Sequence, residues 1–187
     1  MRQLLLSASI ATALSLVAAG CERSPSPEPA SAATAQPAAA AEQVVDEHSY
    51  AEPAKVRTTD LALDLAVDFA KKTLSGTATY SLDWIDKGAS QLLLDTRDIS
   101  VQKAEGLGAD GKWSDLKFGL AGKDPILGSK LTIETPTRPA KVRVTYATSP
   151  EASGLQWLEP SMTEGKKQPF MFSQSQQIHA RSWVPLQ

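Results

Sequence analysis

The chain has 187 residues, a formal net charge of −2 and a pI near 5.7, so it lacks the basic surplus that is typical of nucleic-acid-binding proteins. Its one cysteine, Cys21, excludes an internal disulfide framework and a thiolate zinc cluster. Its two histidines, His48 and His179, are far apart, which excludes a pair of imidazole ligands on one helix.

Residues 1–20 have the features of a secretory signal peptide. Arg2 precedes an apolar stretch, and small residues follow at positions 18–20. The stretch is too short and too rich in Ser, Thr and Ala for a membrane-spanning helix. Cys21 comes directly after it, an arrangement that resembles the lipobox of bacterial lipoproteins. We therefore expect a lipid on Cys21, which anchors the protein in the bacterial cell envelope, at the periplasmic face of the outer membrane; an ordinary cleaved signal is the alternative.

Residues 21–52 are predicted to form a disordered linker after the lipidated cysteine. The segment is rich in proline and alanine, offers few large apolar side chains, and has six acidic residues against Arg23, for a net charge of −5 between residues 22 and 52. Residues 53–187, with 17 basic and 15 acidic residues, are predicted to form the folded domain.

The first predicted strands form a hairpin. Apolar residues alternate with Asp and Ala from residue 60 to residue 69, which predicts a strand with one buried face. Lys71 and Lys72 mark a turn, and a second alternating run follows through Trp84. Gly76, inside that second run, indicates a bulge or a close backbone approach.

Further short strands are predicted along the chain, and no stretch shows a sustained helical period. They cover residues 91–94, 99–103, 130–134 and 141–146. The fold class predicted from these patterns is mostly β, with antiparallel strands in two packed or continuous sheets. Because the chain ends at Gln187 directly after an apolar group, we expect the domain to be incomplete at its C-terminus.

Catalytic motifs are missing from the sequence. It has no His-Glu-x-x-His motif, no Gly-x-Ser-x-Gly elbow and no phosphate-binding glycine loop. Acidic pairs such as Asp95 and Asp98 are common at strand ends and specify no pocket. We therefore predict no catalytic residue and no metal ligand in this chain.

The segment from residue 169 to residue 185 carries the most distinctive polar pattern. Gln174 and Gln176 are two residues apart, so on an extended segment their carboxamides face the same side. Two amides together provide donors and acceptors that suit a peptide backbone or an amine. A polar ladder on a strand surface is the alternative interpretation.

Several stretches resemble the N-terminal domain of the zinc aminopeptidase N family, in its leukotriene-A(4) hydrolase branch. The similarity runs in order over residues 56–187, and its core is Ser-Gln-x-Gln-x-Ile-His-x-Arg with Leu-Gln-Trp-Leu upstream. The stretches that carry it are Val67–Phe69, Thr73–Ala78, Leu94–Ile99, Thr148–Pro150, Leu155–Leu158, Phe172–Gln174 and His179–Arg181.

This resemblance implies a saddle-shaped antiparallel or mixed β domain that covers a separate zinc domain. It implies that Gln176 contacts the free α-amino end of a peptide substrate, with Gln174 beside it and Gln177 at the next position of the cleft. It also places His179 and Arg181 near a domain junction, where structural hydrogen bonding is favoured over catalysis. The exopeptidase loop and the zinc ligands of the family are absent from the sequence.

Two hypotheses of different classes follow. The leading one is the N-terminal part of an exported, lipid-anchored zinc metalloaminopeptidase that removes N-terminal residues from peptides. This part is inactive alone, because the catalytic domain with its zinc is missing. Its partners would be that domain, a peptide N-terminus and the membrane. The alternative is a non-catalytic β-rich envelope lipoprotein that binds peptides or other partners.

Overall fold

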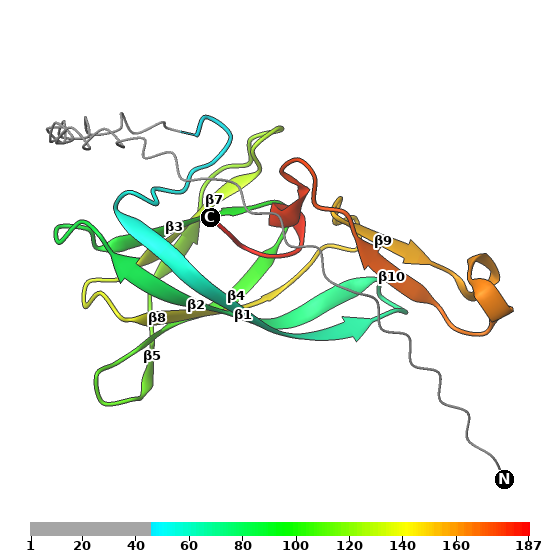
Figure 1. Ribbon diagram of the computed structural model, residues 1–187, viewed down its shortest axis with the longest axis horizontal. Helices are drawn as coiled ribbons and strands as arrows, with labels where there is room; N and C mark the ends of the chain where they lie inside the picture. The colour runs from blue at the N-terminus through cyan, green and yellow to red at the C-terminus, as the bar shows by residue number, and fades with distance from the viewer. Residues whose placement is uncertain (1–45) are drawn as a thin grey trace, which may run out of the picture. The chain divides into compact units, whose positions relative to one another are not determined.

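Antiparallel strands make up most of the computed structural model, which describes residues 46–187 (Figure 1). They form sheets of five, three and two strands. The prediction of a mostly β fold is therefore confirmed. The predicted signal peptide, Cys21 and most of the predicted linker lie outside the described residues. Among residues 46–187, no helix is long and apolar enough to span a bilayer.

The largest sheet has five strands in the order β1-β2-β8-β4-β5. Its first two strands form the predicted hairpin, which turns through Lys72 at a φ of 56°. Gly76 has a φ of 150°, and a Cβ there would lie 2.1 Å from the backbone oxygen of Asp64, which confirms the predicted close approach. The strand bounds are β1 Val56–Asp68, β2 Thr73–Trp84, β4 Ser100–Leu107, β5 Trp113–Asp115 and β8 Lys141–Ala147.

Two smaller sheets complete the strands. One has the order β3-β7-β6, from Gln91–Thr96, Ser129–Glu134 and Phe118–Leu120. The other pairs β9 (Leu155–Leu158) with β10 (Phe170–Ser173). Short 3₁₀ helices at Pro160–Met162 (η1), Glu164–Lys166 (η2) and His179–Ser182 (η3) interrupt or follow this hairpin. The hairpin was not among the predicted strands; none of its residues is buried, so its sequence has no alternation of buried and exposed positions.

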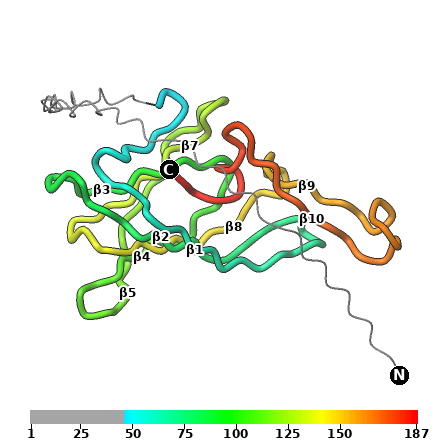
Figure 2. The backbone as a smooth tube through the Cα atoms, viewed as in Figure 1, coloured from blue at the N-terminus to red at the C-terminus, as the bar shows by residue number. Residues whose placement is uncertain are grey.

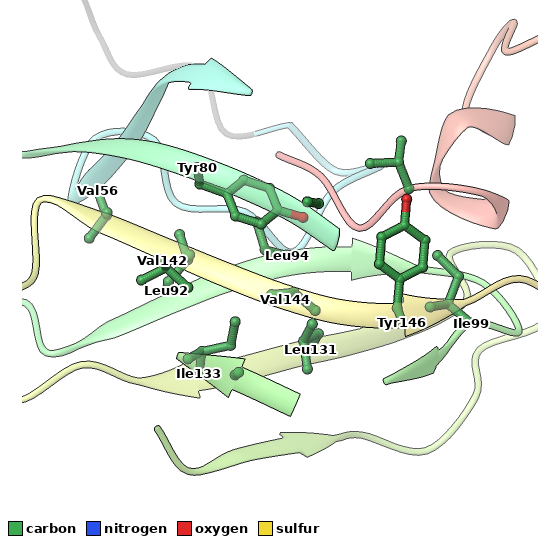
Figure 3. Packing of buried hydrophobic residues seen from close by; sticks show 13 residues of the cluster. Val56, Tyr80, Leu92, Leu94, Ile99, Leu131, Ile133, Val142, Val144 and Tyr146 are labelled. Atoms are coloured by element: carbon green, nitrogen blue, oxygen red, sulfur yellow. The ribbon is translucent and has the colours of Figure 1, made fainter. Parts of the chain in front are cut away.

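The hydrophobic core lies between the five-stranded and three-stranded sheets. Tyr80, Val142, Val144 and Tyr146 of the larger sheet are fully or almost fully buried, as are the facing residues of β3 and β7 (Figure 3). The hydroxyl of Tyr80 donates to the carbonyl of Pro185 over 2.6 Å. The core comprises Val56, Ala78, Tyr80, Leu92, Leu94, Ile99, Ala104, Leu131, Ile133, Val142, Val144, Tyr146 and Val184.

The predicted burial of one β1 face is wrong for the second half of that strand. Leu63 and Val67 keep 40% and 44% of their surface exposed, and Leu61 and Phe69 are similarly exposed. These side chains point to the same side of the sheet as the core residues of β2. β1 is the edge strand, however, and most core residues of this sheet come from β2 and β8. The alternation predicted the strand correctly, but it did not predict how much of the apolar face of β1 is buried against other strands.

A buried ion pair joins three separated parts of the chain. Arg181 lies 3.1 Å from Asp95 on β3, and the two side chains are 6% and 2% exposed. Arg181 also donates to the carbonyls of His48 and Leu127, while Asp95 accepts from Ser49 and from the backbone of Tyr50. Residues 48–50, which the sequence assigned to the linker, thus contact the folded domain. The imidazole of His48 itself is exposed.

Candidate functional site

A polar hollow of about 430 Å³ lies where the start of β9 meets the segment that follows β10. The backbone N–H of Gln174 donates to the carbonyl of Gly154 over 2.9 Å, and this bond holds the two segments side by side (Figure 2). Neutral polar side chains and backbone dominate the lining, and no carboxylate is present in it. The lining residues are Ser153, Gly154, Leu155, Gln156, Gln174, Gln176 and His179.

Gln174 and Gln176 line this hollow together, but not on a strand. β10 ends at Ser173, and the chain then turns toward η3, so the expectation of an extended segment through Gln176 is wrong. The side-chain oxygen of Gln174 accepts the backbone N–H of Gln176 over 3.3 Å. This local bond forms directly after Ser173, the last paired residue of β10. Both glutamines remain exposed.

Gln177 lies at a different place. It lines a smaller hollow of about 180 Å³ together with Ser49, Asp95, Arg181 and Gln187. The structure therefore brings together two of the three glutamines predicted to bind substrate and leaves the third beside the buried ion pair.

His179 contributes to the hollow through a side-chain contact. Its Nδ1 lies 2.8 Å from the hydroxyl oxygen of Ser153. This distance suits a nucleophile and its general base, but a catalytic triad also needs a third group that orients the base. No carboxylate lines the hollow, so the pair instead fixes the orientation of the imidazole ring at the wall.

A second set of contacts holds the wall in place behind the lining. The hydroxyl of Ser182 donates to the carbonyl of His179 and accepts the backbone N–H of Gly154 over 2.8 Å. The indole of Trp183 donates to Ser175, between the two glutamines. A Cβ at Gly154 would lie 2.6 Å from the carbonyl oxygen of His179, so the close approach requires glycine here.

Arg181 is near the hollow in sequence but does not line it, because its guanidinium is buried against Asp95. This placement agrees with the structural role that the resemblance implied. Asp98, the other member of the acidic pair, makes an exposed ion pair with Lys123.

The chemistry available in the hollow is hydrogen bonding by uncharged groups. A carboxamide accepts through its oxygen and donates through its nitrogen, so three of them can bind an ammonium group and an adjacent carbonyl at once. Sequence reasoning missed Ser153 and Gln156. Gln156 lies inside the Leu-Gln-Trp-Leu motif that carried the resemblance, and that motif was the available signal for it.

A zinc ion does not fit the described residues. Within residues 46–187, no three side chains of His, Cys, Asp or Glu converge in a geometry that could hold a metal ion. A zinc site requires at least three such ligands.

Comparison with known proteins identifies similar chains. Residues 48–187 match the Peptidase M1 N-terminal domain family. Leucine aminopeptidase 2 of Yarrowia lipolytica is 36% identical to this chain; the match covers 69% of this chain and 20% of that protein. Leukotriene A-4 hydrolase of Xenopus laevis is 33% identical, and the match covers 77% of this chain and 24% of that protein. The solved structure of native yeast LTA4 hydrolase superposes with a TM-score of 0.69 and 29% identity, over 81% of this chain and 23% of that one. The chain thus spans about a fifth of the length of the curated relatives it matches.

Proposed function

Because this chain belongs to the Peptidase M1 N-terminal domain family, we propose that it forms one wall of the substrate cleft of a zinc aminopeptidase. The complete polypeptide would remove N-terminal residues from peptides. The observation that carries the proposal is that Gln174 and Gln176 line one open hollow with His179.

The amides suit the end of a peptide better than its middle. A free α-amino group is an ammonium ion with three donors, and carboxamide oxygens accept from it without placing an unpaired charge in the empty site. The amide nitrogens can donate to the first carbonyl of the same peptide. An internal peptide bond has one donor where an amino terminus has three, so the hollow favours an exopeptidase substrate.

The zinc ligands would belong to a part of a longer polypeptide outside this chain, since no three suitable side chains converge among residues 46–187. Zinc in such a site supplies a water molecule that is activated for attack on the peptide bond. The residues of this chain would bind and orient the substrate. Gln174 and Gln176 would hold its amino end, and the Ser153 contact would fix the imidazole of His179 beside it.

We further propose that the protein is exported and anchored by a lipid on Cys21, at the periplasmic face of the outer membrane. The support is the order of Arg2, the apolar stretch and the small residues before Cys21. The acyl chains of such an anchor each contribute about 0.8 kcal/mol per buried methylene group, and more than one chain gives stable attachment.

Binding of dipeptides to the purified chain tests the cleft assignment. We expect Leu-Gly to bind and N-acetyl-Leu-Gly to bind at least about tenfold more weakly, because acetylation removes the ammonium donors. Gln174→Ala and Gln176→Ala should weaken the binding of the free dipeptide, whereas Gln102→Ala, at an exposed site on β4, should not.

Equal affinity for the free and acetylated dipeptides would refute the proposal that this hollow recognises an amino terminus. Selective binding by the chain, combined with no hydrolysis by its complete polypeptide, would instead support a peptide-binding lipoprotein.

A further inference from the structure

The contact between Ser153 and His179 joins the two sides of the polar hollow. Nδ1 of His179 lies 2.8 Å from Oγ of Ser153, and both residues line the hollow with Gln174 and Gln176. Ser153 comes shortly before β9, whereas His179 is the first residue of η3, so the contact links positions 26 residues apart. The imidazole therefore has a defined neighbour at the wall where the proposed substrate end would lie.

The backbone of this wall is held without the Ser153–His179 contact. The N–H of Gly154 donates to Oγ of Ser182 over 2.8 Å, and the N–H of Gln174 donates to the carbonyl of Gly154 over 2.9 Å. The Ser153–His179 contact itself is exposed, and the net stability gained from such a neutral hydrogen bond is small because water can replace either partner. Its main effect is therefore on the imidazole ring and not on the fold.

The backbone of His179 is fixed on both sides. Its N–H donates to the carbonyl of Ser175 over 3.1 Å, and its carbonyl accepts the hydroxyl of Ser182 over 2.7 Å. The ring can then turn only about its two side-chain bonds, and the contact with Ser153 selects the orientation that brings Nδ1 to the hydroxyl. Nε2, the other nitrogen, lies on the opposite edge of the ring.

The same contact determines which nitrogen carries the proton. A hydroxyl group has one proton to donate, and the side chain of Ser153 makes no hydrogen bond to any residue between 46 and 187 except His179. A neutral imidazole that accepts at Nδ1 carries its own proton on Nε2. Ser153 thereby makes Nε2 a hydrogen-bond donor.

We propose that His179 binds the substrate through Nε2–H, which donates to the first carbonyl oxygen of the peptide, and that Ser153 is a positioning residue that holds this tautomer and orientation. The inference rests on the proposed function, because it requires the amino end of the peptide to lie at Gln174 and Gln176. Only one carbon atom separates the amino group of a peptide from its first carbonyl, so a donor on the same wall can reach it. A carbonyl oxygen has two lone pairs and can accept from His179 and from an amide nitrogen at once.

Nitrogen NMR of the imidazole rings tests the tautomer. The chain has two histidines, so the isotope-labelled protein gives two sets of ring signals, and His48→Gln identifies which set belongs to His179. Above the pH range in which histidines titrate, we expect the proton of His179 on Nε2. Ser153→Ala should shift part of the population to Nδ1–H, whereas Ser153→Thr keeps the hydroxyl and should keep the wild-type tautomer. A wild-type proton on Nδ1, or the same tautomer ratio in Ser153→Ala, would overturn the role of Ser153.

Ligands with and without the carbonyl test the contact with substrate. Leucine amide and isopentylamine share the ammonium group and the branched side chain, but only leucine amide has the carbonyl. Loss of the carbonyl should weaken binding to the wild type about fivefold more than binding to His179→Phe, which keeps a planar ring without a donor. Ser153→Ala should reduce this difference and Ser153→Thr should restore it. His48→Gln, outside the hollow, should bind both ligands as the wild type does.

The outcomes distinguish this inference from the proposed function. If the carbonyl contributes equally in the wild type and His179→Phe while acetylation still weakens binding of Leu-Gly, the hollow recognises an amino terminus but His179 does not bind the substrate. If acetylation has no effect, or leucine amide does not bind, the proposed function and this inference both fail. The amide signals of Gly154 and Gln174 report whether a variant keeps the wall, and Ser153→Ala, at an exposed position, provides the comparison if His179→Phe disturbs them.

Discussion

Arg181 Nη2 lies 3.1 Å from Asp95 Oδ2 in the protein interior, and this contact joins the two ends of the folded domain. Arg181 belongs to the segment that follows the glutamines, whereas Asp95 receives hydrogen bonds from Ser49 and Tyr50. The backbone of Asp95 also pairs with that of Leu186. One ion pair thus helps to hold the N-terminal segment, β3 and the C-terminal segment together.

Removal of one member of this pair should be strongly destabilising. Arg181→Met leaves Asp95 buried without its cation, which costs about 3–5 kcal/mol in comparable cases. Urea unfolding followed by circular dichroism measures the difference. The matched control is Lys123→Met, which breaks the exposed pair with Asp98 and should cost less than about 1 kcal/mol. Similar losses in both variants would show that the buried pair has no special role.

Gly154 should not tolerate even a methyl group. An added Cβ would lie 2.6 Å from the carbonyl oxygen of His179 and 2.8 Å from the ring of Trp183. We expect Gly154→Ala to lower the free energy of unfolding by about 1–3 kcal/mol, since the backbone on one side must shift. Gly122→Ala, where a Cβ would meet nothing within 4 Å, is the control. Equal stability of the two variants in thermal unfolding would contradict the prediction.

The sequence predicted the strands better than their surroundings. The period-two pattern of residues 60–69 depends on the chain itself and identified β1, but the exposure of Leu63 depends on where a distant sheet ends. The two glutamines were identified from their spacing and from the resemblance. Their arrangement depends on Gly154, which lies far along the chain and contacts Gln174 only after folding. The Arg181–Asp95 pair joins residues too distant for any local pattern to reveal.

Glu105 should make part of the stability depend on pH. Its carboxylate is 8% exposed, and the hydrogen bond from Lys103, followed by the contacts with Arg143, lowers its pKa from the usual 4.5. A carboxylate with a lowered pKa stabilises the folded state above its unfolded pKa and loses that contribution as the pH falls through the folded value. Unfolding free energy should therefore decrease below pH 4.5, and more steeply than in Glu105→Gln.

Chemical denaturation between neutral and acidic pH gives this comparison, with Glu151→Gln as the control because Glu151 is exposed and makes no ion pair among residues 46–187. Parallel pH profiles for the wild type and Glu105→Gln would rule out the contribution of Glu105. Lys103, Arg143 and Glu105 lie on β4 and β8, and none of them lines the polar hollow, so peptide binding should be unaffected by the substitution.

Cys21→Ser tests the proposed anchor. If the cysteine carries the acyl chains, the substitution removes the apolar groups that hold the protein at the bilayer, and the protein should move from the membrane fraction to the soluble fraction. Fractionation followed by immunoblotting measures the change. Ser24→Ala, three residues further along the predicted linker, should remain with the membranes. Membrane association of Cys21→Ser equal to that of the wild type would contradict lipid anchoring at this residue.

Gln176→Ala in the complete polypeptide tests whether the hollow belongs to a catalytic cleft. The substitution removes an acceptor for the substrate ammonium group, so kcat/KM for aminoacyl amides should fall at least about tenfold, equivalent to about 1.4 kcal/mol. Gln102→Ala, at an exposed position on β4, should leave kcat/KM unchanged. Gln176→Glu separates charge from shape, because a carboxylate accepts from the ammonium more strongly but cannot donate to the adjacent carbonyl. Unchanged kcat/KM in Gln176→Ala would show that this residue is not part of the site. If kcat/KM falls in Gln176→Ala but stays at the wild-type value in Gln176→Glu, acceptance of a hydrogen bond from the amine is the main contribution of Gln176.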